Sequence, residues 1–300
     1  MKKASMWGLK WGFGIKVLLI LSLLILATQS IHAQDSLASR KKLVSYGALA
    51  SYSTALVGLN QLWYKDYPQS TFHFFNDNEQ WLQIDKVGHA YSTYVLGKAS
   101  AATFKWAGYS QKQSALYGSG GAFLFLTTVE IFDAYSQNWG FSWGDFAANT
   151  LGNGLYLGQE LAWQEQVMLL KFSYSPSIYR EQRPNLLGDS ELQGVLKDYN
   201  GQTYWASFNL NSLASSIKPK WLNLAVGMGG EQMLFARNSE QLGLNHQRQW
   251  YLSPDIDFER IPTKKKWLKV AFSLINCLKM PLPALELQNG KNLNFKWIHY

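Results

Sequence analysis

The chain has 300 residues, of which 47% are hydrophobic, 16% are charged and 15% are aromatic. A disordered polymer is excluded, because such chains carry far more charge and too little apolar surface to fold. The single cysteine, Cys277, excludes a disulfide framework and every cysteine-based zinc or iron–sulfur site. The length suffices for one or two domains with a sizeable core.

The first 33 residues have the three parts of a secretory signal peptide. Four lysines and no acidic residue come first, an apolar run over residues 17–28 follows, and Ala33 offers a small residue at the cleavage site. We predict cleavage after Ala33 and an exported protein of the periplasm or outer membrane; an uncleaved anchor is the alternative. Removal of the four lysines lowers the net charge from +8 to +4, which favours an anionic lipid surface over nucleic acid as a partner.

Residues 34–170 are predicted to form an apolar bundle of about four helices. The first helix contains the uncharged stretch 43–64, and the others are expected at 85–106, 113–135 and 142–166. Helices this apolar lie either inside a large bundle or against lipid, and lengths near twenty residues are compatible with both.

The periodicity of the sequence changes from 3.6 to 2 beyond about residue 200. Apolar and polar residues alternate there in four segments, 203–210, 222–229, 250–258 and 292–297. One apolar and one polar face per strand indicates an antiparallel sheet. We expect about five strands, whereas a closed outer-membrane barrel needs eight or more, so a partial sheet packed on the helices is predicted.

The predicted fold class is therefore α+β, with the helical bundle followed by a linker over residues 171–200 and a β region over residues 201–300. Within the β region, residues 263–280 read as a basic amphipathic helix. Its lysines either form a solvated face or rest on a membrane surface.

Ionisable residues stand out in the helical half, because burying an unpaired charge is costly. The candidates for a ligand-binding site, on three of the predicted helices, are Asp85, Lys86, His89, Glu130, Asp133, Asp145 and Asn149. Spacings of three or four residues place members of the same helix on one face. We expect the three faces to converge on one site, where histidine and carboxylates suit a divalent metal, an acid–base pair or a clamp for a polar headgroup.

Each candidate also has a structural explanation. Asp85 could offset the dipole in the first turn of its helix, and Asp145 could complete a capping box that begins at Ser142. His89 could be a hydrogen-bonded core histidine. If a metal binds, the candidate ligands are His89, Glu130, Asp133 and Asp145.

Three blocks in this order carry a resemblance to known families. They are residues 85–89 (Asp-Lys-Val-Gly-His), residues 130–133 (Glu-Ile-Phe-Asp) and residues 142–152, and they resemble the YfiM-type family of predicted periplasmic lipoproteins of unknown function. They look more distantly similar to the VanZ-like family of small helical membrane proteins associated with glycopeptide-antibiotic resistance. The resemblance covers about residues 80–160. The positions that it matches are Asp85, Lys86, His89, Glu130, Asp145 and Asn149.

The resemblance implies an envelope location and a site, but no established reaction. Two departures limit what it implies. No cysteine lies near Ala33 to carry a lipid anchor, and Asp133 stands where VanZ-like sequences tend to carry glutamine.

Three functions stay open. The first is a membrane-associated envelope protein that binds a lipid-linked or amphiphilic molecule at the polar residues. The second is a metal-assisted hydrolase of a lipid or cell-wall substrate, and the third is a purely structural envelope protein. Whether the chain is an enzyme is undecided, because the sequence has no nucleophile elbow, no Walker-type loop and no His-Glu-x-x-His motif. The expected partners are a membrane lipid surface and other envelope proteins, and not nucleic acid; a divalent metal is the one candidate cofactor.

Overall fold

A computed structural model describes residues 37–64, 67–238 and 245–300. The predicted signal peptide and its cleavage site lie outside the described residues. The first half of the described chain contains four long helices, which are α2 (Leu37–Leu59), α3 (Ile84–Trp106), α4 (Gln111–Ala134) and α5 (Trp143–Ala162). A π-helical segment, η1 (Asn60–Tyr64), continues α2, and a short helix, η2 (Trp81–Gln83), precedes α3.

The second half contains an antiparallel sheet whose six strands pair in chain order. The strands are β1 (Met168–Tyr174), β2 (Gln202–Asn209), β3 (Leu222–Glu231), β4 (Gln247–Ile256), β5 (Leu282–Gln288) and β6 (Asn292–His299). The connections carry α6 (Ile178–Gln182), α7 (Pro184–Leu187), α8 (Glu191–Lys197), α9 (Leu210–Leu213), η4 (Phe258–Arg260) and α10 (Lys266–Ile275). The α+β class and the helices-then-sheet order are confirmed.

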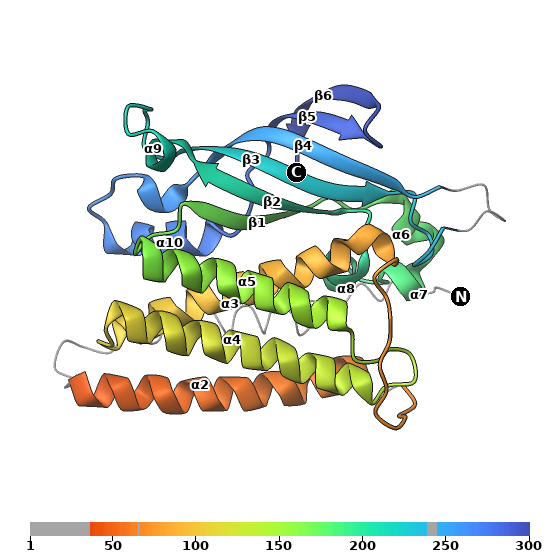
Figure 1. Ribbon diagram of the computed structural model, residues 1–300, viewed down its shortest axis with the longest axis horizontal. Helices are drawn as coiled ribbons and strands as arrows, with labels where there is room; N and C mark the ends of the chain where they lie inside the picture. The colour runs from red at the N-terminus through yellow and green to blue at the C-terminus, as the bar shows by residue number, and fades with distance from the viewer. Residues whose placement is uncertain (1–36, 65–66, 239–244) are drawn as a thin grey trace, which may run out of the picture.

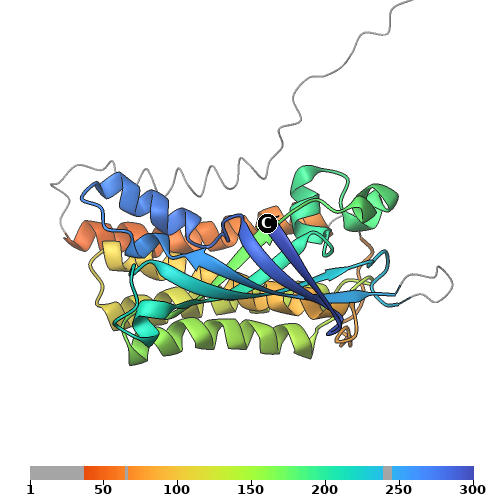
Figure 2. The same cartoon turned by 90° about the horizontal axis from the view of Figure 1, so that it is seen from above.

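The molecule is layered, as Figure 1 shows: α2 lies along one side, α4 next, then α3 and α5, and the sheet covers them from the opposite side. Seen from above, the strands cross over the helical layer (Figure 2). Helix α3 is central, because it packs on α4, on α5 and on strands β1 to β3. Small residues allow this packing: Gly118 of α4 meets the backbone of Ala101, and Gly152 of α5 meets the backbone of Ala90.

The sheet curls strongly. His299 of β6 stacks on Tyr251 of β4 with ring centroids 4.0 Å apart, and it also reaches Trp205 of β2 at 5.7 Å. The free edge of β1 is bonded to the segment before β5, where Phe172 N donates to Cys277 O and Lys279 N donates to Phe172 O. The curled sheet therefore has an inner face, enclosed by the chain itself, and an outer face.

Two sequence expectations need correction. The sheet has six strands in the described residues rather than about five, because β1 follows α5 after a short loop and its apolar residues read as a continuation of that helix. The basic helix is shorter than expected: α10 spans Lys266–Ile275, and residues 277–279 leave it to pair with β1. The stretch 171–200, interpreted as a linker, contains the end of β1 and three short helices.

Candidate functional site

The start of α3 follows a left-handed turn. Trp81, Leu82 and Gln83 all have positive φ angles, of 49°, 49° and 57°. Such a turn is unfavourable by about 1–2 kcal/mol per residue for side chains other than glycine. Burial of the Trp81 ring and a 2.6 Å hydrogen bond from Arg248 Nη2 to Gln83 Oε1 hold it in place. The turn directs Asp85 and the residues after it towards the other helices.

Ser142 fixes the start of α5. Its hydroxyl accepts a hydrogen bond from the Asp145 backbone amide at 3.1 Å, which is an N-cap, and donates to Asp77 Oδ1 at 2.7 Å. The carboxylate of Asp145 is not part of this cap, because it faces Lys86 and His89 instead. The serine thus joins the loop before η2 to the first turn of α5.

Lys86 lies among three carboxylates. Its Nζ is 2.6 Å from Asp77 Oδ2, 3.0 Å from Asp85 Oδ2 and 2.9 Å from Asp145 Oδ1. Burial alone would lower the pKa of Lys86, but the adjacent charges of Asp85 and Asp145 outweigh burial and raise it, so the ammonium stays charged. Gly144 makes room for this side chain, since a Cβ atom there would lie 2.9 Å from Lys86 Cε.

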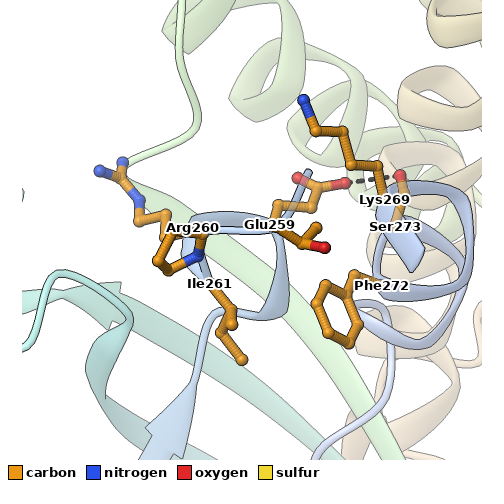
Figure 3. A pocket seen from close by; sticks show the side chains of 8 residues that line it. Glu259, Arg260, Ile261, Lys269, Phe272 and Ser273 are labelled. Carbon is orange, nitrogen blue, oxygen red and sulfur yellow. Dashed lines mark hydrogen bonds between the residues drawn. The ribbon is translucent and has the colours of Figure 1, made fainter. Parts of the chain in front are cut away.

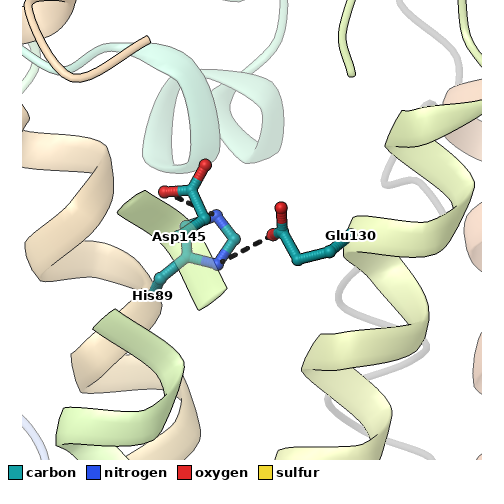
Figure 4. A group of neighbouring side chains, drawn as sticks. All are labelled: His89, Glu130 and Asp145. Carbon is teal, nitrogen blue, oxygen red and sulfur yellow. Dashed lines mark ion pairs between the residues drawn. The ribbon is translucent and has the colours of Figure 1, made fainter. Parts of the chain in front are cut away.

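His89 lies between the carboxylates of Glu130 and Asp145, one from each neighbouring helix (Figure 4). Its Nδ1 is 3.5 Å from Glu130 Oε1 on α4, and its Nε2 is 3.7 Å from Asp145 Oδ1 on α5. The side chain of His89 is 22% exposed, whereas that of Glu130 is 1% exposed. The group is therefore accessible from the histidine side and closed on the glutamate side.

The amide of Asn149 orients His89. Asn149 Oδ1 lies 3.2 Å from His89 Nδ1 and accepts a 3.0 Å hydrogen bond from Thr93 Oγ1. When Nδ1 carries the ring proton, it donates to this oxygen, and Nε2 is left as the nitrogen that can bind a cation beside Asp145. An orienting acceptor of this kind is common behind metal-binding histidines.

The carboxyl of Glu130 is held in an unfavourable environment. Burial, followed by the charges of Asp145 and Asp133, raises its pKa to about 9, so it carries a proton at neutral pH. Its Oε1 has no hydrogen-bond partner in the described structure. Burial also raises the pKa of Asp133 to about 7, although that carboxylate accepts a 2.8 Å hydrogen bond from Tyr64.

The pKa values of Asp85 and Asp77 shift in opposite directions. Burial raises the pKa of Asp85, more than the neighbouring Lys86 lowers it. Burial acts in the same direction on Asp77, but hydrogen bonds from Lys86 and Ser142 outweigh it and hold its pKa below the usual value. The surroundings thus favour the charged forms of Lys86 and Asp77, whereas burial favours the protonated form of Glu130.

Two groups of three side chains in this cluster have the spacing of metal ligands: His89 with Glu130 and Asp145, and Asp77 with Asp85 and Asp145. In each group, one ligand atom per residue lies within 4.8 Å of the others. The Lys86 ammonium already occupies the second group. In the first group, the buried Oε1 of Glu130 has no hydrogen-bond partner. The group offers one histidine nitrogen and two carboxylate oxygens, a donor set that can bind zinc or manganese.

The structure thus brings together six of the seven predicted residues, Asp85, Lys86, His89, Glu130, Asp145 and Asn149, and places Asp133 beside them, bonded to Tyr64. Sequence reasoning missed Asp77 and the linking role of Ser142. Asp77 lies on a loop without periodicity, and no sequence signal marks it.

A separate surface hollow of about 520 Å³ lies between η4 and α10 (Figure 3). Its lining includes Glu259, Lys269 and Phe272, and Glu259 accepts a 2.6 Å hydrogen bond from Ser273. None of the cluster residues lines this hollow, so it is a different place on the molecule.

The fold and the cluster together describe an α+β protein with a polar site inside an apolar helical bundle. Residues 73–158 match the model of a family described as predicted periplasmic lipoprotein (DUF2279). No curated protein and no solved structure matches the chain. The family resemblance inferred from the sequence blocks is confirmed over this segment, which contains the whole cluster from Asp77 to Asn149; the likeness to the VanZ-like family stays a prediction.

The family description agrees with the predicted export, and the chain is an envelope protein of uncharacterised activity. The sequence lacks the cysteine that a lipoprotein would use near the predicted cleavage site, because Cys277 is the single cysteine of the chain.

Proposed function

We propose that this envelope protein binds a divalent cation at His89, Glu130 and Asp145 and, through that cation, the polar headgroup of an amphiphilic molecule at a membrane. The observation that carries the proposal is the charge imbalance of the cluster. Its ion pairs involve four carboxylates, those of Asp77, Asp85, Glu130 and Asp145, and one lysine. A surplus of carboxylates attracts cations and repels a bare phosphate.

The role of the bound cation follows from the donor set. His89 Nε2, one oxygen of Glu130 and one of Asp145 would hold it, and Glu130 would release its proton on binding. Three protein ligands leave coordination positions for oxygens of a ligand. A phosphate or hydroxyl group of an amphiphile could fill them, which reconciles an acidic site with an anionic headgroup.

Membrane association is supported by the outer helices. Large apolar side chains of α2 and α4 are exposed, including Tyr46, Leu49, Val57 and Leu124. Among the described helices, α4 is long and apolar enough to cross a membrane by length and composition, a property that core helices of soluble proteins share. Exposed apolar helix faces favour a lipid contact next to the cluster.

The proposal is tested by titrating the purified mature protein, after chelation, with Zn²⁺, Mn²⁺, Ca²⁺ and Mg²⁺ in a calorimeter. We expect one site, and we expect His89→Gln and Glu130→Gln to weaken binding at least 100-fold while thermal melts show that the fold persists. Glu259→Gln, a carboxylate change in the surface hollow, is the matched control. Undiminished binding in both cluster variants, or loss of the fold in step with loss of binding, favours the purely structural interpretation.

A second candidate function, metal-assisted hydrolysis of a lipid or cell-wall substrate, is supported by the protonated state of Glu130. A carboxylic acid with a pKa of about 9 can donate a proton to a leaving group at neutral pH; in this candidate function Glu130 keeps its proton and is not a ligand of the metal. Incubation of the metal-loaded protein with a lipid phosphate ester in vesicles tests this candidate. Product formation that a chelator stops and Glu259→Gln preserves would support hydrolysis; binding without turnover would leave the binding function.

A further inference from the structure

The two faces of the curled sheet have the opposite polarity to that of a sheet in a water-soluble protein. Along β3, β4 and β5 the buried positions are mainly polar or small, whereas the half-exposed positions are apolar. One outer row runs across the strand register as Val226, Leu252, Leu285 and Phe295. The next row runs as Met228, Trp250, Leu287 and Leu293.

The inner face carries the charges. Lys171 and Asp255 are fully buried there, 2.9 Å apart, and Ser207 donates a 2.6 Å hydrogen bond to the same carboxylate. Further along, Glu286 is buried and pairs with Lys296 at 3.0 Å. A sheet that faced water on its outer side would place these groups outward and the leucines inward.

The helices cover only part of the outer face. Tyr91 of α3 packs against Phe172 and Tyr204, which begin the second outer row on β1 and β2. Figure 1 shows that β5 and β6 lie at the end of the sheet farthest from the helices. Met228 packs against the core around Trp81 and Ile84, whereas the other seven residues of the two rows are exposed, and exposure on β6 rises to 78% at Trp297.

We infer that the outer face of β3 to β6 rests on a lipid bilayer, with its side chains in contact with the hydrocarbon region. The two rows on these strands contain no charged side chain, and their polar atoms are the Trp250 indole N–H and the Met228 sulfur, which accepts from Arg248 Nη1 at 3.2 Å. Protein–protein interfaces carry about one direct hydrogen bond per 100–200 Å² of buried area, whereas hydrocarbon offers none. Polar-inside, apolar-outside alternation is the pattern that a lipid environment stabilises.

The contact is interfacial and does not span the bilayer. Strand β6 is an edge of the sheet, so one side of its backbone has no strand partner among the described residues. Backbone groups without partners are not tolerated deep in hydrocarbon. Aromatic rings such as Trp250 and Trp297 suit the boundary between headgroups and acyl chains. This surface is separate from the polar cluster, and the inference stands without the proposed cation.

Spin labels on the full mature chain test the inference. In a Cys277→Ser background, single cysteines at Leu252 and Leu285 report on the face, and Leu213→Cys on α9 and Lys291→Cys in the β5–β6 turn are exposed controls. With phosphatidylglycerol–phosphatidylethanolamine vesicles, we expect the face labels to become several-fold more accessible to oxygen than to a water-soluble nickel complex. The controls should stay accessible to nickel.

Nickel accessibility at Leu252 and Leu285 in the presence of vesicles would overturn the inference, because the face would then be in water. Exclusion of both reagents, dependent on protein concentration, would also overturn it and would indicate a second copy on the face. A charge test is independent of the labels: Leu252→Lys with Leu285→Lys should reduce co-sedimentation with vesicles at least tenfold, whereas Leu213→Lys should not. Vesicle binding of the wild type should be the same with and without a chelator, which separates this result from failure of the cation site.

Discussion

Both halves of the molecule bury charge, but they neutralise it differently. In the sheet, each buried acid has a basic partner: Asp255 lies beside Lys171 and Lys279, and Glu286 pairs with Lys296. In the helical cluster, four carboxylates share Lys86 and a partly exposed histidine. A neutralised interior fixes a structure, whereas an interior with surplus acid is stable only if protons or added cations compensate it.

The protonation of the two halves follows this difference. Burial lowers the pKa of Lys279 to about 8, so the sheet can shed its extra positive charge. The cluster instead retains a proton on Glu130, whose pKa is raised to about 9. The buried charges of the sheet therefore compensate one another, whereas the cluster would exchange its proton for the proposed cation.

The largest expected effect is in the sheet. Asp255→Ala leaves Lys171 and Lys279 buried beside no carboxylate, and removal of one partner of a buried pair costs about 3–5 kcal/mol. Denaturant unfolding should show this loss. Glu191→Ala, which removes an exposed partner of Arg180, is the control and should cost at most about 1 kcal/mol. Equal losses in both variants would mean that the sheet interior is not held by its charges.

The next effect concerns the pH dependence of the cation-free protein. The folded state keeps a proton on Glu130 that the unfolded chain releases above its ordinary pKa of 4.5. Stabilisation by this proton is complete below pH 4.5 and is lost as the pH rises towards 9. Relative to Glu130→Gln, the wild type should lose up to about 4 kcal/mol between pH 5 and 8. Parallel pH profiles of unfolding for the two proteins would show that Glu130 is ionised throughout.

Lys86→Met should have a somewhat smaller effect. It removes the ammonium from between Asp77, Asp85 and Asp145 and should destabilise the cation-free protein by about 2–3 kcal/mol at neutral pH. Millimolar Ca²⁺ or Mn²⁺ should recover part of this loss, since the vacated group has the spacing of metal ligands. Thermal melts with and without the ions measure both steps, and a loss that no cation recovers would assign Lys86 a packing role alone.

The smallest expected effect separates helix packing from helix propensity. A Cβ atom at Gly152 would lie 2.0 Å from Ala90 O, so Gly152→Ala should push α5 from α3 and cost about 1–3 kcal/mol. At Gly154, two residues further along α5, no heavy atom lies within 4 Å of such a Cβ. Gly154→Ala should therefore stabilise the same helix by up to about 1 kcal/mol. Unfolding of the two variants side by side checks the opposite signs.

Much of the fold is readable from periodicity. The expected helices at 85–106 and 113–135 correspond to α3 and α4 within two residues at each end, because long apolar helices give a strong repeat. Strand β1 escaped notice because it is short and comes soon after α5. The curl of the sheet also had no sequence signal, since contacts such as His299 on Tyr251 join residues far apart in the chain.

The spacing of the residues also indicated most members of the cluster, but not which side chains contact one another. The same-face spacing of Asp85 with His89, and of Asp145 with Asn149, could be read directly. Asp145 contacts both Lys86 and His89 because of the way in which the helices pack against one another. The periodicity of the sequence carries no information about this packing. Asp77 reaches the cluster from a loop through Ser142, and only the folded chain reveals that link.

The left-handed turn before α3 also forms hydrogen bonds that join the helical half of the molecule to the sheet. Arg248, at the start of β4, donates to Gln83, and the Trp81 amide donates to Ala236 O in the connection between β3 and β4. Two residues beyond Gln83, α3 presents Asp85 to the cluster. A force that tilts β4 is thereby transmitted to the first turn of α3. Docking of the sheet on a bilayer would consequently set the orientation of the carboxylates that are proposed to bind a cation.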